Sequence, residues 1–392
     1  MSTIASDKFD HWIRTDFRVL NTSLEEIYFV QEDPAAVEGV GNDLKTQLVT
    51  QGRAHVEALM AEGDTHQPFD TAFNTLGNLG LFMAALRRHE LTNPDRETES
   101  PFKRTSALCL RIASSLGVAP RFVSPHLSAN NLAIDGVQKA FTNLPDETIF
   151  NDYNLYSILY YKRAAEALMH IPALGVSASA STMMLKEAKY ALEQVAIYNK
   201  TLFDKLDVKR FFYSVRPYFK SHRVGKINYR GANAGDFAGI NQIDLLLGLC
   251  RGDDLFYGNI LAEKMQYMRP EDQRDVQRTL RIPPLMDGFV EALDQHANTD
   301  WFQENCRLFL EVCEAHGRTA MQHQNMLVDK FISKPAETME TQHLKQVTAS
   351  GPPLQELIDH LTHLRDLRIA APRDDIDTAY KQIEMLKAVL RG

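Results

Sequence analysis

The sequence predicts an all-α fold, because apolar residues recur at helical spacing along most of its 392 residues. It contains no convincing set of alternating strands, no sustained heptads and no internal repeat. A chain of this length favours two lobes or one large helical unit. We therefore expect a large helical bundle at residues 119–392 and a smaller N-terminal helical lobe at residues 1–118.

Composition points to a protein that handles a small molecule. Hydrophobic residues make up 44% and charged residues 24% of the chain, which is ordinary for a globular protein. The net charge of -8 argues against a nucleic-acid or anionic membrane surface. The longest apolar run in the first third, residues 79–86, is far shorter than the roughly 20 residues that span a bilayer. We expect no nucleic-acid or membrane partner, and the oligomeric state is left open.

The cysteines indicate the compartment. They form no CxxC pair, and no basic-then-apolar leader precedes them at the N-terminus. We therefore expect reduced, buried thiols and a cytoplasmic location. The four residues are Cys109, Cys250, Cys306 and Cys313.

The first part of the chain contains two helical patterns, from about 36 to 62 and from about 69 to 89. A polar break, TNPDRETES at 92–100, follows as a candidate lobe boundary, and Pro101 starts a further helix. The proline- and asparagine-rich loop at 119–131 then crosses to the second lobe.

The next helix is capped by LPDET at 144–148, and we expect it to run from near Asn151 to about His170. It carries an unusually aromatic face with one hydroxyl, Ser157. Such a stripe is typical of a protein core, but the wall of a pocket for an aromatic ligand has the same composition. Both interpretations stay open at this point. The aromatic residues are Tyr153, Tyr156, Tyr160 and Tyr161.

The stretch from 211 to 250 carries the strongest indications of a ligand site. It predicts a helix end, a glycine loop and a buried helix. The three glycines of GANAGDFAG allow the backbone to approach a flat or closely packed neighbour. Arg216 has a mostly apolar setting, where its guanidinium fits a carboxylate in a two-pronged geometry. The alternative is a structural arginine, stacked on Tyr218 or paired with an acid.

Residues 300–332 predict one long helix with two histidines, His316 and His323, on its buried face. These histidines are seven residues apart, about 10.5 Å along the axis, so they cannot bind one metal ion together. Each is either a packed core histidine or the single neutral imidazole that holds haem iron with one open position.

Other chemical motifs are weaker. The Glu-x-x-His formed by Glu340 and His343 lies in a polar segment, and a di-iron bundle needs two such motifs. The chain has no HExxH, no zinc-ribbon cysteine spacing, no P-loop, no dinucleotide GxGxxG and no GxSxG elbow.

Three segments stand in a characteristic order: FFYSVRPYF, GANAGDFAGINQIDLLLGL and MQYMRPEDQRDVQRTL. They are similar to a Phe-Phe-x-x-x-Arg stretch, a glycine loop with its following helix, and a Met-x-x-Tyr-Met-Pro-Pro helix start. In this order they resemble the indoleamine and tryptophan 2,3-dioxygenase superfamily, including its pyrrolnitrin-synthase-like natural-product branch. The resemblance covers about residues 119–368. It implies the helical bundle of indoleamine 2,3-dioxygenase, heme b with its iron as cofactor, and dioxygen as co-substrate.

The resemblance also implies roles for individual residues. His323 falls on the proximal haem ligand, with His316 as the fallback, and Arg216 falls on the arginine that binds the substrate carboxylate. The family further has an aromatic pair against the indole, polar and aromatic residues in the distal pocket, and loops near the haem. The pair is Phe211 and Phe212, the pocket residues are Ser157 and Tyr153, and the loop residues are Asn233, Ala234, Gly235 and Gly351.

The chain departs from the family pattern at several positions. Asn233 replaces a serine, Tyr153 replaces a phenylalanine, and His126 occupies a distal-side position that is a cysteine in some relatives. The proline pair at 352–353 stiffens a loop that normally closes on substrate. These changes predict a more polar pocket, in which Ser157 or His126 adjusts hydrogen bonding to oxygen or substrate.

Residues and resemblance together indicate a haem-dependent oxygenase or dioxygenase, an oxidoreductase that uses dioxygen to oxidise an amino acid. Tryptophan or a tryptophan derivative is the first expectation. The alternatives are haem-dependent N-oxygenation or oxidative rearrangement of another amino acid in natural-product biosynthesis, and a non-catalytic haem sensor or carrier.

Overall fold

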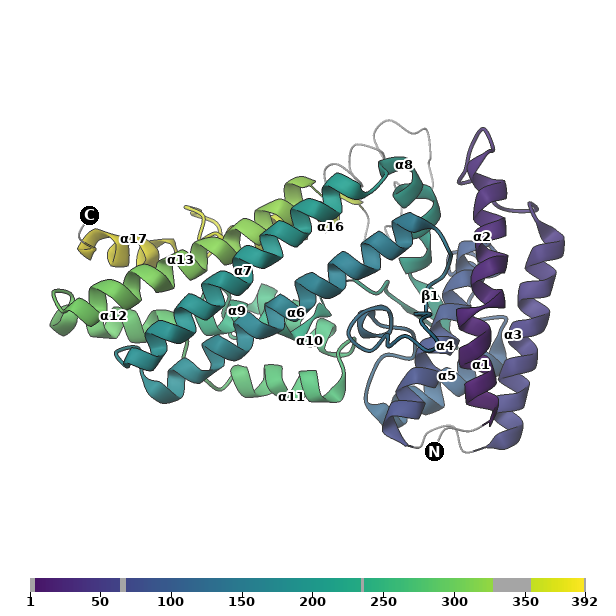
Figure 1. Ribbon diagram of the computed structural model, residues 1–392, viewed down its shortest axis with the longest axis horizontal. Helices are drawn as coiled ribbons and strands as arrows, with labels where there is room; N and C mark the ends of the chain where they lie inside the picture. Colours follow the sequence, from purple (N-terminus) through teal and green to yellow (C-terminus); the bar gives the residue numbers. More distant parts are fainter. Residues whose placement is uncertain (1–3, 64–67, 234–235, 327–353, 391–392) are drawn as a thin grey trace. The chain divides into compact units, whose positions relative to one another are not determined.

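The computed structural model describes residues 4–63, 68–233, 236–326 and 354–390 (Figure 1). Helices make up nearly all of the regular structure in these ranges, and one two-stranded antiparallel sheet is the exception. The predicted all-α class is therefore confirmed. Within the same ranges, no helix is long and apolar enough to cross a bilayer.

The chain forms two compact units, which we describe one at a time. The first takes in Met1–Asp152 and Lys205–Ala234, as far as these residues are described. The second takes in Tyr153–Asp204, Gly235–Lys334 and Gln355–Gly392, with the same restriction. The lobe boundary at residue 118 stays a prediction.

The first unit consists of long helices followed by short elements (Figure 1). The long helices are α1 (Ile4–Arg14), α2 (Asp16–Phe29), α3 (Asn42–Glu62), α4 (Phe69–Arg88) and α5 (Lys103–Leu116). The short elements are η1 (Ser124–Leu127), α8 (Val208–Arg210), the π turn η2 (Phe211–Val215), the 3-10 turn η3 (Arg216–Phe219), β1 (His222–Val224) and β2 (Ile227–Tyr229).

Helix α4 is the centre of the first unit. Its residues are buried almost without interruption from Ala72 to Leu86, and a helix that is apolar on all sides is stable only when other elements cover each side. Helices α1 and α5 pack on it. Gly80 permits the closest approach, because a Cβ at this position would lie 1.9 Å from the backbone nitrogen of Phe122.

A β-hairpin lies within the segment for which the sequence predicts a helix end and a glycine loop. Strand β1 pairs antiparallel with β2, and His222 stands opposite Tyr229. Gly225 reverses the chain between the strands with a φ of +59°, which favours glycine. Strands of three residues are too short to show an alternating pattern, so the sequence does not reveal them.

The second unit is built from helices. They are α6 (Pro145–Leu174, from Tyr153 on), α7 (Ser179–Lys205), α9 (Ala238–Leu247), α10 (Leu255–Met265), α11 (Pro270–Thr279), α12 (Leu285–His296), α13 (Asp300–Gln322), α16 (Leu354–Arg368) and α17 (Tyr380–Val389).

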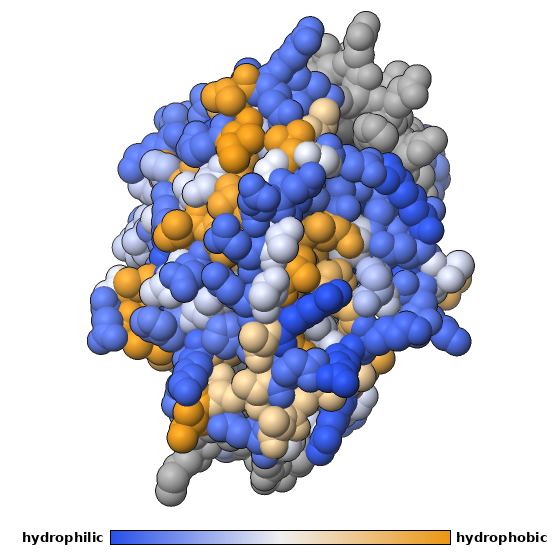
Figure 2. All heavy atoms as spheres, turned by 90° about the vertical axis from the view of Figure 1, so that its right-hand side faces the viewer, coloured by the Kyte–Doolittle hydropathy of each residue, from blue (hydrophilic) through white to orange (hydrophobic). Residues whose placement is uncertain are grey.

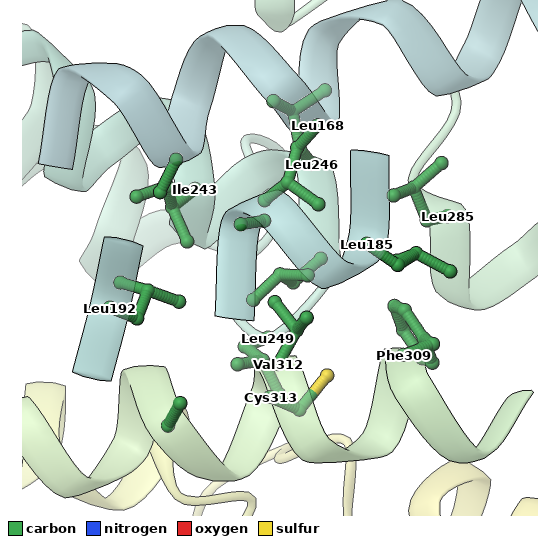
Figure 3. Close-up of a cluster of buried hydrophobic side chains, with 14 of the residues drawn as sticks. Leu168, Leu185, Leu192, Ile243, Leu246, Leu249, Leu285, Phe309, Val312 and Cys313 are labelled. Atoms are coloured by element: carbon green, nitrogen blue, oxygen red, sulfur yellow. The ribbon is translucent and has the colours of Figure 1, made fainter. Parts of the chain in front are cut away.

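Side chains from α6, α7, α9 and α13 meet in the core of the second unit (Figure 3). Leu168 of α6, Leu192 of α7 and Ile243 of α9 are completely buried there. Gly239 at the start of α9 lies against α6, since a Cβ at this position would be 3.1 Å from the backbone nitrogen of Lys162. The predicted close backbone approach is thus observed at this glycine.

Three helix starts differ from the prediction, and the smallest difference is at α5, which begins at Lys103 rather than Pro101. Helix α3 begins at Asn42 rather than near residue 36, because Gly39 and Gly41 adopt positive φ values of 76° and 69° that no α-helix contains. Helix α6 begins at Pro145 rather than near Asn151. Proline suits a first helical position, where no backbone N–H is needed.

Figure 2 looks onto the side of the first unit that carries α2 and α3. Hydrophilic residues dominate this face, and apolar ones are scattered among them. Val19 and Val30 are exposed on α2 and at its C-terminal cap. Single apolar side chains of this kind are ordinary on protein surfaces.

Candidate functional site

The haem-ligand candidates lie on α13 in the second unit. Thr299 caps this helix, since its side chain accepts a hydrogen bond from the backbone nitrogen of Phe302. The stripe predicted to be buried is buried from Phe302 to His316 and on to Ala320. The helix therefore presents one face to the core up to its last turn.

His316 is held in the core by a carboxylate. Its Nε2 donates a 2.7 Å hydrogen bond to Asp244 of α9, and both side chains are buried. Arg368 of α16 donates two further bonds to the same carboxylate, from Nε at 2.8 Å and from Nη2 at 2.7 Å. Tyr257 of α10 donates a fourth at 3.0 Å. The carboxylate thus ties four helices together.

Electrostatics keep Asp244 charged. Burial alone would raise the pKa of this carboxyl, but the Arg368 guanidinium and the His316 hydrogen bond hold it well below its usual range. The negative charge of Asp244 and its hydrogen bonds in turn raise the pKa of Arg368, although burial alone would lower it. His316 is therefore part of a buried ion network, and its role as the fallback haem ligand stays a prediction.

His323 has a different setting. It lies at the C-terminal cap of α13, where residues 323–326 continue as a π turn. Its side chain is exposed rather than on the buried face, so that prediction is wrong. The hydrogen-bond pattern changes at this residue, and a wider π turn moves side chains out of the three-four register.

The protein keeps the His323 imidazole neutral. Loss of solvent around the ring, the largest cause, and the positive charges of Arg368 and Lys264 lower the pKa of this imidazole. His323 as a whole residue is exposed, which weakens the effect of lost solvent. The pKa is still lowered, because both charged neighbours are cations. A neutral imidazole is the form that binds a metal.

Ser157 and Tyr153 lie on α6 of the second unit. Ser157 is buried, and its hydroxyl donates a 3.1 Å hydrogen bond to Asn199 Oδ1 on α7. Tyr153 is half-buried, with its ring centroid 5.8 Å from that of Tyr156 and 6.3 Å from that of Tyr198. Because the Ser157 hydroxyl already donates its proton to Asn199, it can contact a ligand only as a hydrogen-bond acceptor.

In the first unit, one turn brings three predicted residues together. Phe211 and Phe212 are buried in the π turn η2, and Arg216 follows in η3. The Arg216 guanidinium lies 5.5 Å from the centre of the Phe212 ring. Phe212, rather than Tyr218, is its aromatic neighbour within the described residues.

Arg216 is a buried cation with no acidic partner among the described residues. Its exposed fraction is 6%, and no hydrogen bond or ion pair joins its side chain to another residue in the part of the chain that the structure describes. Burial lowers the pKa of Arg216 to about 10. The described residues thus contain no acid that pairs with Arg216, as the structural alternative would require.

His126 has both ring nitrogens occupied by the backbone. Nδ1 accepts a 2.9 Å hydrogen bond from the Val123 nitrogen, so Nε2 carries the proton and donates to the Phe73 carbonyl at 2.9 Å. The ring also stacks on the Phe73 ring with centroids 4.0 Å apart. A catalytic role stays a prediction, and it would cost one of these buried hydrogen bonds.

The remaining predicted residues belong to loops. Asn233 is half-buried, and its carbonyl accepts a 2.7 Å hydrogen bond from the Ser124 hydroxyl. Ala234, Gly235 and Gly351 lie outside the described residues.

Sequence reasoning missed the Asp244 network. The available signal was one acidic residue inside the apolar run at 240–249, because a charge in such a run needs a buried partner. Arg368 could not be identified as that partner, since it lies 124 residues further along the chain.

The helical fold, the neutral imidazole of His323 and the buried Arg216, which has no acidic partner among the described residues, fit the class of helical haem oxygenases. A family model described as monodechloroaminopyrrolnitrin synthase PrnB matches residues 3–390. The chain belongs to this family, the pyrrolnitrin-synthase branch of the haem oxygenase superfamily, and the resemblance is confirmed. It is a haem-dependent oxygenase, an oxidoreductase. The family uses dioxygen and implies a tryptophan derivative as substrate in natural-product biosynthesis.

Proposed function

We propose that the chain holds haem through His323 and oxidises tryptophan or a substituted tryptophan whose carboxylate binds Arg216. The observation that carries this proposal is the burial of Arg216 without an acidic partner among the described residues. An unpaired buried cation is unfavourable. A ligand carboxylate would supply the missing anion in a two-pronged geometry.

His323 fits the role of the residue that would bind the haem iron. His323 is an exposed residue whose neutral form is favoured, and no hydrogen bond joins its ring to a described residue. His316 is less accessible to haem than His323, because its exposed fraction is 1%. When bound, haem supplies the activation of dioxygen.

The other side chains position the substrate. Arg216 fixes the carboxylate end, and the buried Phe211 and Phe212 offer aromatic surface to an indole. Ser157 can accept a hydrogen bond through its free lone pairs. Holding a reactant in one orientation supplies much of the rate of such a reaction.

Polar contacts decide which tryptophan derivative fits best. The predicted polarity of the pocket rested on His126 and Tyr153, but both nitrogens of His126 are satisfied by backbone groups. Of these two residues, Tyr153 is the one whose phenol would contact a polar substituent on the indole. The buried, unpaired state of the four cysteines supports the proposed cytoplasmic location.

The carboxylate contact is tested with Arg216→Lys. Spectral titration of the ferrous haem protein compares tryptophan with tryptamine, which lacks the carboxylate. We expect the variant to lose roughly 2–5 kcal/mol of tryptophan binding and to leave tryptamine unchanged. Arg104→Lys, an exposed pair with Glu57 in the same unit, is the matched control. Equal wild-type affinity for both ligands would contradict the proposal.

The reaction itself is tested by incubating the ferrous protein with oxygen and tryptophan, then with halogenated and hydroxylated tryptophans, under mass spectrometry. We expect oxidised products from a substituted tryptophan. Fast formation of formylkynurenine from unmodified tryptophan would instead establish plain dioxygenation. Products from a different amino acid alone would favour the N-oxygenation or rearrangement alternative.

A further inference from the structure

A second cation, Lys220, belongs to the same turn region as Arg216. Lys220 follows it by four residues, at the C-terminal cap of η3, and is half-buried. In the described ranges, no hydrogen bond or ion pair engages its ammonium group. A lysine of this kind usually reaches solvent or a carboxylate, because burying an ammonium group alone is unfavourable.

The charges around Lys220 are mostly positive. Arg87 and Arg88 at the end of α4 and Arg216 on its own turn disfavour its protonated form, and only Glu90 favours it. Burial adds to this effect and is the largest cause, so the pKa of Lys220 falls to about 7. These positive charges come from α4 and η3, two elements that pack on each other.

The two α4 arginines already have their own acids. Arg87 donates to Glu90 at 2.6 Å, and Arg88 binds both carboxylate oxygens of Glu25 at 2.8 Å. The other two cations of the cluster, Arg216 and Lys220, have no such acid among the described residues. Among the described residues, the cluster therefore has an excess of positive charge that a bound anion would neutralise.

We propose that Lys220 is a second cation of the carboxylate site, binding the substrate carboxylate together with Arg216 and taking up one proton from solvent when the substrate binds. This inference rests on the proposed function. The anion adds a negative charge beside the amine, which favours its protonated form. Substrate binding is then coupled to protonation, whereas a site built from arginine alone has no such coupling.

The coupling has a defined sign. Below about pH 7 the amine of the free protein is already protonated, so the affinity for a carboxylate ligand is constant. Above that pH the free amine is neutral and must gain a proton on binding. The affinity therefore falls with rising pH, by about tenfold per unit while a whole proton is taken up.

The test is calorimetry of the haem protein with tryptophan and tryptamine at about pH 8, in two buffers with different heats of ionisation. The wild type should take up close to one proton per tryptophan and none per tryptamine. Lys220→Met should bind tryptophan roughly tenfold to a hundredfold more weakly and without proton uptake. Lys226→Met, exposed in the hairpin of the same unit, is the control.

Lys220→Arg separates charge from titration. Arginine stays protonated, so this variant should keep the preference for tryptophan and lose the proton uptake. Two results would overturn this inference and leave the proposed function standing. The first is a Lys220→Met variant with wild-type tryptophan affinity and wild-type proton uptake. The second is a Lys220→Met variant that loses haem but still binds tryptophan. Equal wild-type binding of tryptophan and tryptamine would instead contradict the proposed function. Circular dichroism confirms that each variant is folded.

Discussion

The carboxylate of Asp244 should be the most sensitive single group in the second unit. Asp244→Asn keeps the size of the side chain and removes its charge. The amide has one acceptor oxygen, and its NH2 group would face donors from His316 or Arg368. At least one buried donor would therefore lose its partner.

The structure sets the size of the effect. Asp244 accepts four hydrogen bonds from described residues, three of them from His316 and Arg368 at 2.7–2.8 Å. Breaking a buried pair by neutralising one partner costs about 3–5 kcal/mol. A domain is typically stable by about 5–15 kcal/mol, so this single change should remove a large share of the total.

The assay can report on this unit alone. Trp12 and Trp301 are the two tryptophans of the chain, one in each unit, so Trp301 fluorescence in a Trp12→Phe background follows urea unfolding of the second unit. We expect Asp244→Asn to lower the urea midpoint strongly. Asp287→Asn should cost less than about 1 kcal/mol, because the Arg251–Asp287 pair is partly exposed.

The pH dependence provides an independent check. The pKa of Asp244 is held well below its usual range in the folded protein, so its stabilisation is fully present above its unfolded pKa of about 3.9 and lost as the pH falls below it. Asp244→Asn should lack this acid-dependent slope. Wild-type urea midpoints and an unchanged acid slope in Asp244→Asn would refute the reasoning, because the neutral amide would then satisfy its neighbours.

The remaining predictions concern both units. His323→Ala should abolish or grossly weaken haem retention, whereas His316→Ala should destabilise the fold but leave a Soret band; the reverse result would exclude His323 as the ligand. Gly80→Ala should destabilise the first unit by about 1–3 kcal/mol, because the new methyl group would clash with the Phe122 backbone; an unchanged melting temperature would contradict this. Lys220→Met should raise the melting temperature below about pH 7, and the gain should shrink as the pH rises toward about 10.4, because the wild type must bury an ammonium group at the lower pH. A gain that grows with pH would contradict the assignment.

Short-range patterns account for what the sequence predicts well. Helical spacing identifies α4 and α13, since each element carries its own apolar face. Phe211, Phe212 and Arg216 lie within six consecutive residues, so their location in one turn region follows from spacing alone. These features need no knowledge of distant contacts.

Long-range contacts and small register changes account for what the sequence misses. The bond from Arg368 to Asp244 joins residues 124 apart, and nothing in either segment specifies the other. The exposure of His323 depends on a switch from α to π hydrogen bonding, which moves side chains without changing the apolar pattern before it. Periodicity extended through that switch gives the wrong face.

The two histidines of α13 show why residue type and spacing alone do not assign a ligand. Both lie on one helix seven residues apart, and both have an imidazole that can bind iron. The difference lies in Arg368, whose guanidinium pairs with the carboxylate that holds His316, while its charge favours the neutral form of His323. Arg368 thus helps to fix the carboxylate that holds His316, and its charge also lowers the pKa of His323. The assignment of the iron ligand therefore depends on a residue that is itself no candidate for the iron.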